Sequence, residues 1–433
     1  MRFSRPVLWK ISLACALTLS ALPARAESDA QQSPSALAQW QDTLGLSGTV
    51  RASEFSKDAS FSDETGYTVG SVWVTAKPKE FWGIKTYFDA RVQAQDLTRN
   101  SKASWDLREG YAQKTLGNLD VRVGRQIVVW GRADKVNPTD SWSTREYTLL
   151  APSDDDQRLG VTSMQATWNA GPYRLIALWQ PEWRYPSLPI PPLPPGLSLQ
   201  NVAPSDSLQQ VGFKIDHSGE GLDWSVSYAH VLDRMPDLAI LPTPVQGLPV
   251  GLIYRPVSVV GADAAIPMGQ YGLRGEIAYT RTENQDAPNA ITKRPNLFAV
   301  LGVERTFNGE LNINLQYLYR RTFDFVPLSS YSNPTTRLLA DQVDLLSNQL
   351  APDMQGASLR INYKAFNETL EFEIAGVTWF HRGDSAIDPK VSYAFTDHLN
   401  AIVGGQLYHG PTESFFGRLG PTSNAYAEVQ VGF

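Results

Sequence analysis

The residues best suited to chemistry gather in one short run, residues 124–134, which reads Gly-Arg-Gln-Ile-Val-Val-Trp-Gly-Arg-Ala-Asp. Arginine guanidinium groups bind oxyanions and carboxylates through two parallel hydrogen bonds, so Arg125 and Arg132 are candidates for contacting a charged solute. The run also fits a structural role, in which one arginine pairs with Asp134 and holds a loop. In that role Trp130 packs at a membrane interface.

Charged side chains of both signs also recur at alternate positions of other segments. Such a set lines a polar passage, or it closes on itself through mutual ion pairs. Together with the first run, these positions make up the candidate pore-lining and constriction residues: Lys85, Asp89, Arg91, Arg122, Arg125, Trp130, Arg132, Asp134, Arg274, Glu276, Arg360 and Glu371.

The segments that carry these charges alternate apolar and polar residues over about ten positions, which is typical of a strand with one buried face. In residues 84–95, Phe88 and Val92 share the apolar side, whereas Lys85, Asp89 and Arg91 share the other. About 18 segments are predicted strands, with 16 as the alternative count: 44–55, 67–77, 83–96, 105–114, 119–130, 158–168, 173–184, 207–216, 222–232, 254–266, 272–282, 296–306, 311–322, 354–364, 368–380, 389–395, 399–408 and 423–433.

The spacing between these segments alternates between short and long. Short gaps such as 116–118 and 307–310 are rich in turn formers, and long gaps include 131–157, 185–206 and 323–353. A soluble sandwich would alternate along its strands as well, but short turns on one side and long loops on the other are typical of an outer-membrane barrel. We therefore predict an all-β fold: a single up-and-down antiparallel transmembrane β-barrel over residues 44–433.

The first 26 residues resemble a cleaved secretory signal peptide, with a basic start, a short apolar core and Ala24-Arg25-Ala26 before the cut. Residues 27–43 are then a short periplasmic segment. Cleavage takes the net charge from -6 to -10, because the lost segment holds four Lys and Arg and no acid. So acidic a chain is a poor candidate for binding nucleic acid.

Gly124 is predicted to permit a β-bulge. Val123 belongs to the apolar face, and without a bulge Arg125 would follow it there. With the bulge, Arg125, Arg132 and Asp134 project into the pore mouth, and residues 131–157 fold inward as a constriction.

The run 124–134 resembles an element, Gly-Arg-Gln…Trp-Gly, shared by outer-membrane porin-like families, among them the alginate-export family with its barrel of about 18 strands. The final strand alternates from Ala425 to Phe433 and is similar to the assembly signal of bacterial outer-membrane proteins. The resemblance implies a location in the bacterial outer membrane, contact with its lipid and lipopolysaccharide, and recognition by the barrel-assembly machinery. The oligomeric state stays open.

The sequence shows few of the residue patterns that are typical of enzymes. It lacks a zinc-ligand spacing and a glycine-rich phosphate loop, so neither a metal nor a cofactor is expected. His217 and His398 each follow an aspartate in a predicted turn, where such a pair usually serves the turn. Asp154–Asp156 are read as a solvated loop tip, with a hard cation such as Ca²⁺ as the alternative.

We therefore expect an outer-membrane channel that passes small or amphipathic solutes through a lumen of mixed charge. The alternatives are an exporter of an anionic polysaccharide and a barrel-embedded lipid or peptide hydrolase. Alginate passage would favour a constriction rich in arginine and lysine, whereas both signs occur here. Three apolar, proline-rich loops, at 188–195, 238–242 and 323–328, are expected to form a lid or to receive a hydrophobic molecule.

Overall fold

The computed structural model describes residues 43–57, 66–97, 102–188, 197–204, 209–241, 248–283 and 290–433. The predicted signal peptide and residues 27–42 lie outside the described residues. Within the described ranges, no helix is both long enough and apolar enough to cross a membrane.

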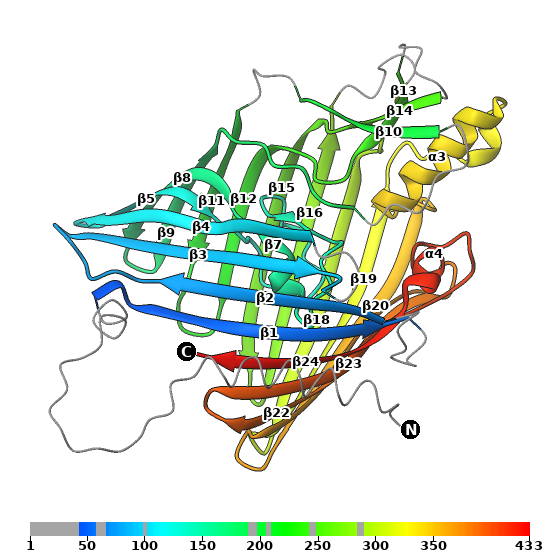
Figure 1. The fold of residues 1–433 in the computed structure, drawn as a ribbon. Helices are drawn as coiled ribbons and strands as arrows, with labels where there is room; N and C mark the ends of the chain where they lie inside the picture. The colour runs from blue at the N-terminus through cyan, green and yellow to red at the C-terminus, as the bar shows by residue number, and fades with distance from the viewer. Residues whose placement is uncertain are drawn as a thin grey trace, which may run out of the picture.

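One sheet of eighteen antiparallel strands makes up the body of the molecule (Figure 1). In order around the sheet they are β1 (Leu46–Ser56), β2 (Gly66–Ala76), β3 (Ile84–Gln95), β4 (Lys102–Leu116), β5 (Leu119–Gln126), β8 (Val161–Ala170), β9 (Tyr173–Gln180), β11 (Gln210–His217), β12 (Asp223–Leu232), β15 (Pro256–Met268), β16 (Tyr271–Thr282), β18 (Asn296–Phe307), β19 (Leu311–Thr322), β20 (Asp353–Ala365), β21 (Leu370–Trp379), β22 (Asp384–Thr396), β23 (Leu399–His409) and β24 (Asn424–Gly432).

The sheet closes into a barrel because β24 pairs with β23 on one side and with β1 on the other. Each predicted strand overlaps one barrel strand, so the predicted fold class and the count of eighteen are confirmed. Closure leaves no strand edge unpaired, which a structure surrounded by lipid requires.

Side chains alternate between the two faces of the wall. On β3, Val92 is 54% exposed on the outer face, whereas Arg91 beside it is 5% exposed and points inward. Leu301 of β18 and Phe213 of β11 also lie on the outer face, where they are 66% and 58% exposed. The outside is therefore apolar, as the period of two predicts.

One end of the barrel, here called the turn end, carries tight turns. The turns after β4, β8 and β15 each contain a glycine with positive φ, Gly117, Gly171 and Gly269. No atom lies within 4 Å of a Cβ built at these positions, so the left-handed backbone, and not crowding, explains the glycine.

The opposite end, the loop end, carries the additional elements named below. A second sheet joins β10 (Leu197–Val202), β14 (Leu248–Ile253), β13 (Asp237–Ile240) and β17 (Ala290–Ile291). The other elements are α3 (Pro334–Ser347), α4 (Phe415–Leu419), η2 (Leu328–Ser330) and η3 (Gly420–Thr422), and, in the loop after β5, β6 (Thr144–Arg145), η1 (Asp154–Gln157) and β7 (Arg158–Leu159).

Helix α3 was not predicted, but its boundaries follow from its sequence. The Asn333 side chain accepts hydrogen bonds from the backbone N–H groups of Thr335 and Thr336, and Pro334 fills the first helical position. Asn348 ends the helix in a left-handed conformation with φ of 52°.

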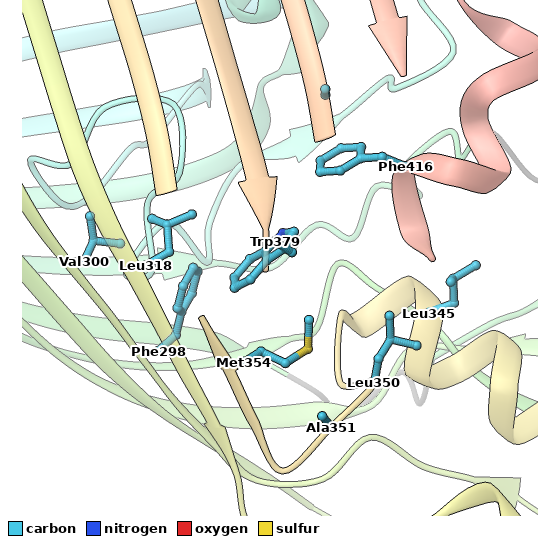
Figure 2. Close-up of a cluster of buried hydrophobic side chains, with 10 residues drawn as sticks. Phe298, Val300, Leu318, Leu345, Leu350, Ala351, Met354, Trp379 and Phe416 are labelled. Carbon is cyan, nitrogen blue, oxygen red and sulfur yellow. The ribbon is translucent and has the colours of Figure 1, made fainter. Parts of the chain in front are cut away.

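Buried apolar side chains join α3 and α4 to the inside of the barrel wall (Figure 2). Leu345 of α3 and Phe416 of α4 lie in one cluster with Phe298, Leu318 and Trp379 from the strands. Near the loop end, this part of the interior is therefore apolar.

The predicted bulge at Gly124 is wrong. The ladders of β5 with β4 and with β8 run through Gly124 without a shift in register. The break lies between β3 and β4, where Asp89 faces Glu109 and Ala90 faces Leu107, so Arg108 is the extra residue. Gly124 is needed for another reason: with φ of 130°, a Cβ there would lie 2.3 Å from the carbonyl oxygen of Gly110.

Candidate constriction site

The segment between β5 and β8, residues 127–160, folds into the barrel, and we call it the inward loop. It contains the predicted constriction, 131–157, and contacts the barrel wall in several places. Trp142 and Val128 of this loop are only 1% and 7% exposed. Its position depends on groups from strands far apart in the chain.

The carboxylate of Glu276, on β16, holds the loop at its first turn. It accepts hydrogen bonds from the backbone N–H groups of Arg132 (3.0 Å), Ala133 (2.9 Å) and Thr139 (2.7 Å), and from the Thr139 hydroxyl (2.9 Å). A Cβ on Gly131, whose φ is 96°, would lie 2.6 Å from this carboxylate. Only glycine therefore lets the backbone wrap so closely around the acid.

Arg132 extends this anchor to two further strands. One guanidinium nitrogen lies 2.6 Å from Asp216 of β11, and the other contacts Asp263 of β15. Because both carboxylates are only 2% exposed, these pairs are screened little by solvent.

A second anchor lies on β1, β3 and β4. The guanidinium groups of Arg51, Arg91 and Arg108 lie 4.4, 5.2 and 4.9 Å from the ring of Trp73, within cation–π distance. Arg51 pairs with Asp156 of the loop at 2.7 Å.

The other two arginines of this cluster also reach the loop. Arg91 pairs with Glu146 at 2.5 Å. Arg108 donates to the carbonyl oxygen of Asp155 at 3.0 Å while pairing with Asp89 at 2.7 Å. The three arginines therefore bind a single stretch of the loop to one side of the barrel.

An apolar cluster forms the third anchor. Trp130 and Trp142 pack edge to face at 5.2 Å, among Val231, Val257 and other inward-facing side chains of β9, β12, β15 and β16. A Cβ on Gly212 would lie 2.3 Å from Trp142, so the glycine makes room for the ring. Trp130 is 4% exposed and lies inside the barrel, away from any membrane interface.

On its fourth side the loop faces β20–β24 across a cavity of about 370 Å³. We call it the polar chamber; residues of both signs line it, including Asp134, Lys135, Arg360, Glu373, Asp388 and Lys390. Among the described residues, two ion pairs cross it, from Asp134 to Arg360 at 3.2 Å and from Lys135 to Asp388.

An apolar cavity of about 350 Å³, the outer chamber, adjoins the polar chamber toward the loop end. Its lining includes Leu199, Leu238, Leu252, Leu345, Tyr408 and Phe416. The two chambers share Lys135, Arg145, Asp154, Asp388 and Gln406 as lining residues, so they are contiguous.

Two of the proline-rich loops reach the outer chamber, through Leu188 and Leu238. The rest of the first loop, 189–195, lies outside the described residues, as does Pro242. In the third loop, the Phe323 ring instead packs against Tyr279 and is 39% exposed. Segments that were not predicted, α3 and α4, supply much of the remaining lining.

The acidic triplet 154–156 lies in the inward loop, where Asp154 and Asp155 line the polar chamber and remain solvated, with side chains 49% and 83% exposed, whereas Asp156 is 13% exposed. Each carboxylate faces a cation: Asp154 lies 3.6 Å from Lys135, Asp155 pairs with Arg158 at 3.2 Å, and Asp156 pairs with Arg51. Among the described residues, no group of three His, Cys, Asp or Glu side chains is arranged to hold a metal ion.

The remaining candidate residues lie away from the chambers. Arg125 pairs with Glu182 at 2.9 Å and donates to the Leu107 carbonyl oxygen. It lines none of the chambers, because the unbroken register of β5 keeps it on the outward side.

Four further candidates lie toward the turn end of the lumen. Arg122 bonds to Gln113 and stacks on Tyr111, and Arg274 pairs with Glu304 at 2.6 Å. Glu371 accepts from Asn362, and Lys85 is exposed.

Sequence reasoning missed Arg51, Arg108, Lys135, Arg145 and Asp388. Arg51 stands at an inward position of β1, within the predicted strand 44–55, so its parity alone was a usable signal. Asp388 precedes the predicted strand 389–395, and β22 begins earlier, at Asp384. Because Arg108 lies at a bulge, the alternation of faces with a period of two does not give the direction of its side chain. Lys135 and Arg145 belong to the inward loop, whose path no period predicts.

His230 lies beside Ser258 and Glu283 at the loop-end rim, which is the kind of grouping a barrel hydrolase needs. The Ser258 hydroxyl oxygen is 3.3 Å and the Glu283 carboxylate 3.7 Å from the ring, but both face the same nitrogen, Nδ1. A relay needs the serine on one ring nitrogen and the acid on the other. This grouping therefore does not form a catalytic triad.

At the loop end, burial raises the pKa of Asp344 on α3 to about 7, and the nearby charge of Asp341 adds to the effect. Asp341 itself contacts Arg418 of α4. The two helices that border the outer chamber are thus joined by one ion pair, next to a carboxyl group that titrates near neutral pH.

No protein-family model matches the chain, and neither does any curated protein. Several solved structures match the chain. OccAB2 of Acinetobacter baumannii matches with a TM-score of 0.53 and 11% identity, over 90% of this chain and 96% of that chain. OccAB1 of the same organism matches with a TM-score of 0.52 and 9% identity, over 90% of this chain and 95% of that chain.

OccK2 (OpdF) of Pseudomonas aeruginosa was solved in complex with glucuronate. It matches with a TM-score of 0.51 and 10% identity, over 90% of this chain and 96% of that chain. Identities this low establish the fold alone. The chain therefore has the same fold as these proteins, a closed antiparallel β-barrel.

Proposed function

We propose that this protein is a bacterial outer-membrane channel through which small solutes diffuse past the inward loop. The observation that carries the proposal is the uneven anchoring of that loop. Three sides are bound to the wall by buried ion pairs, a hydrogen-bonded carboxylate and packed tryptophans. The fourth side borders two contiguous chambers, and there the passage runs.

The outer surface supports placement in a membrane. Its apolar wall ends in exposed aromatic side chains at both rims. Trp82 and Phe366 are 80% and 76% exposed near the turn end, and Trp105 and Phe380 are 79% and 54% exposed near the loop end. Aromatic residues at both interfaces are typical of outer-membrane barrels, and a charge on the lipid face would cost about 2–4 kcal/mol at the midplane.

The lining of the passage indicates the class of solute. An entering molecule first meets the apolar outer chamber and then the polar chamber, where carboxylates and cations alternate. A small amphipathic solute suits both surfaces, since its apolar part contacts the first and its polar group the second.

Planar-bilayer recordings of the purified protein test the channel. We expect single-channel steps in the wild type and larger steps after deletion of 131–157. Because the loop is anchored to eight strands or more, folding of the variant must first be established by its heat-modifiable mobility. Folded wild-type and deletion proteins that both fail to conduct would refute the channel.

Export of an anionic polysaccharide is the alternative that the likeness of residues 124–134 to alginate-export barrels suggests. The pairing of cations with carboxylates in the polar chamber favours small solutes over a polyanion. Alginate oligomers added to either side of the bilayer distinguish the two: block or passage at micromolar concentration would favour the exporter.

A hydrolase at the His230 rim is the other alternative. Ser258→Ala should leave conductance unchanged, and neither the wild type nor the variant should release fatty acid from phospholipid vesicles or cleave a peptide library. Release or cleavage that Ser258→Ala abolishes would favour the enzyme.

Assembly through the last strand is a further part of the proposal. The backbone of Phe433 exchanges two hydrogen bonds of 3.0 Å with Gly48, and its ring covers that glycine. Removing Phe433 should lower the amount of barrel inserted by reconstituted assembly machinery, while Phe433→Trp should retain it. Equal insertion of the truncated chain would contradict a role for this residue.

A further inference from the structure

A third cavity, of about 340 Å³, lies on the other face of the inward loop. We call it the side chamber; its lining includes Arg145, Arg234, Arg320, Val257, Phe298 and Leu346. It shares Arg145, Tyr147, Met235 and Leu346 with the outer chamber, so a solute in the outer chamber has access to it.

Arg234 is the most unusual group of this chamber. Its side chain is 8% exposed and stacks 4.7 Å from the centre of the Trp183 ring. Nη2 donates to the Trp142 carbonyl oxygen and to Gln180, at 2.8 and 2.9 Å. Nε and Nη1 are buried without any hydrogen-bond partner.

Arg320 repeats this pattern on the opposite wall. Its guanidinium lies 4.3 Å from the Phe298 ring, and Nη1 donates to the carbonyl oxygens of Ser347 and Asn348 at the end of α3. Its Nε is also buried without a partner. Arg145, the third arginine, lines all three chambers and forms no ion pair within the described residues.

The carboxylates of the side chamber form their ion pairs with other cations and not with these arginines. Asp140 pairs with Arg158 at 2.6 Å, and Asp233 pairs with Lys293 at 3.1 Å. Elsewhere in the barrel, inward arginines such as Arg132 meet carboxylates directly. The charged groups that line the side chamber are thus four cations and two carboxylates, and among the described residues its three arginines form no ion pair. Asp140 and Asp233 act on Arg234 from beyond ion-pair distance.

Burial lowers the pKa of Arg234 to about 10, so at neutral pH the group remains a cation. Burying a cation without a partner is costly, and an oxyanion offers the acceptors that its free N–H groups lack. Three guanidinium groups around one cavity match the several oxygens of a phosphate, sulfate or carboxylate group.

We propose that the side chamber is a binding site for a small oxyanion, held by Arg145, Arg234 and Arg320. The anion is either a free inorganic ion or the acidic group of a solute; the second case rests on the proposed channel function. In that case the acidic group enters the side chamber while the apolar part stays in the outer chamber.

Calorimetric titration of the full-length protein in neutral detergent, with inorganic phosphate at low salt, tests the site. We expect saturable binding that Arg145→Gln weakens about tenfold or more, the usual effect of losing a charge-assisted hydrogen bond. Arg281 is an exposed arginine on the outer face of β16, and the control variant Arg281→Gln should bind phosphate as the wild type does.

Arg234→Gln should weaken binding further, provided that its unfolding midpoint shows a folded barrel. Arg145→Gln keeps the test decisive if Arg234→Gln fails to fold, because Arg145 is only half-buried. Absence of saturable binding, or equal affinity in the wild type and Arg145→Gln, would overturn the proposal.

Flux through reconstituted vesicles separates the two sources of the anion. Phosphate that slows passage of an aromatic carboxylate but not of a neutral sugar identifies a site for solutes in transit. Phosphate that binds without changing either flux identifies a resident inorganic ion. If phosphate binds and no solute passes, only the channel fails; if solutes pass and phosphate does not bind, only this inference fails.

Discussion

The turn half and the loop half of this barrel share one outer face but differ in what fills them. Toward the turn end the lumen holds exposed, weakly paired polar groups, such as Arg274 with Glu304, whose side chains are 38% and 27% exposed. Toward the loop end the interior holds buried ion pairs and apolar clusters that contain Trp130, Trp142 and Trp379. Contact with lipid dictates the outer face along the whole wall, whereas the inner face depends on which loop returns to meet it.

The largest difference between the halves is expected at two glutamates of neighbouring strands. Glu276→Ala leaves the backbone N–H groups of Arg132 and Ala133 without an acceptor and leaves that of Thr139 only the longer bond to Asn137. It should therefore lower the free energy of unfolding by about 3–5 kcal/mol. Glu304→Ala, in the turn half, should lower it by less than about 1 kcal/mol. Urea unfolding in detergent measures both, and equal losses would contradict the comparison.

Two glycines give the next largest contrast. Gly131→Ala strains a backbone with φ of 96° and drives a Cβ into Glu276, so we expect a loss of about 2–4 kcal/mol and noisier single-channel currents. Gly171 has φ of 62° and no atom within 4 Å of a built Cβ. In Gly171→Ala, backbone strain alone should therefore lower the free energy of unfolding by about 1 kcal/mol. Thermal unfolding of the two variants, side by side, ranks them, and a reversed order would refute the close approach at Gly131.

A pH effect should be confined to the loop half. The pKa of Asp344 is raised in the folded protein to about 7 from an ordinary 3.8, so the proton stabilises the packing of α3. That contribution is complete below about pH 4 and is lost as the pH rises through 7. Proteolysis of the loop region should therefore quicken between pH 6 and 8.

Asp344→Asn should make this proteolysis nearly independent of pH. Asp341→Asn, which loses the contact with Arg418, should quicken it at every pH and move its pH dependence to lower pH, because the charge of Asp341 helps to raise the pKa of Asp344. A wild-type profile that is flat from pH 5 to 8 would exclude a role for Asp344.

The smallest expected effect concerns ion preference. Lys135→Gln removes a cation from the polar chamber, so the reversal potential in a salt gradient should move toward cation selectivity. Lys85→Gln, in the turn half, should move it less, because solvent screens an exposed charge. Equal shifts would show that the polar chamber does not control selectivity.

The strands could be predicted because lipid and lumen alternate along each one with a period of two. The charges on β3, β16 and β20 were assigned to the inner face on that basis, and Asp89, Arg91, Glu276 and Arg360 do lie inside. The error at Gly124 has the same origin, since an irregularity in one strand cannot be located from that strand alone. The bulge at Arg108 exists only in the register between β3 and β4.

The amino-acid sequence by itself determined the number of strands, their inward and outward faces and the positions of the turns, because these depend on neighbouring residues and on contact with lipid. Tertiary structure alone decided the path of the inward loop and the three chambers around it. Glu276, Trp73 and Asp388 stand far from that loop in the chain, and only closure of the barrel brings them to its surface.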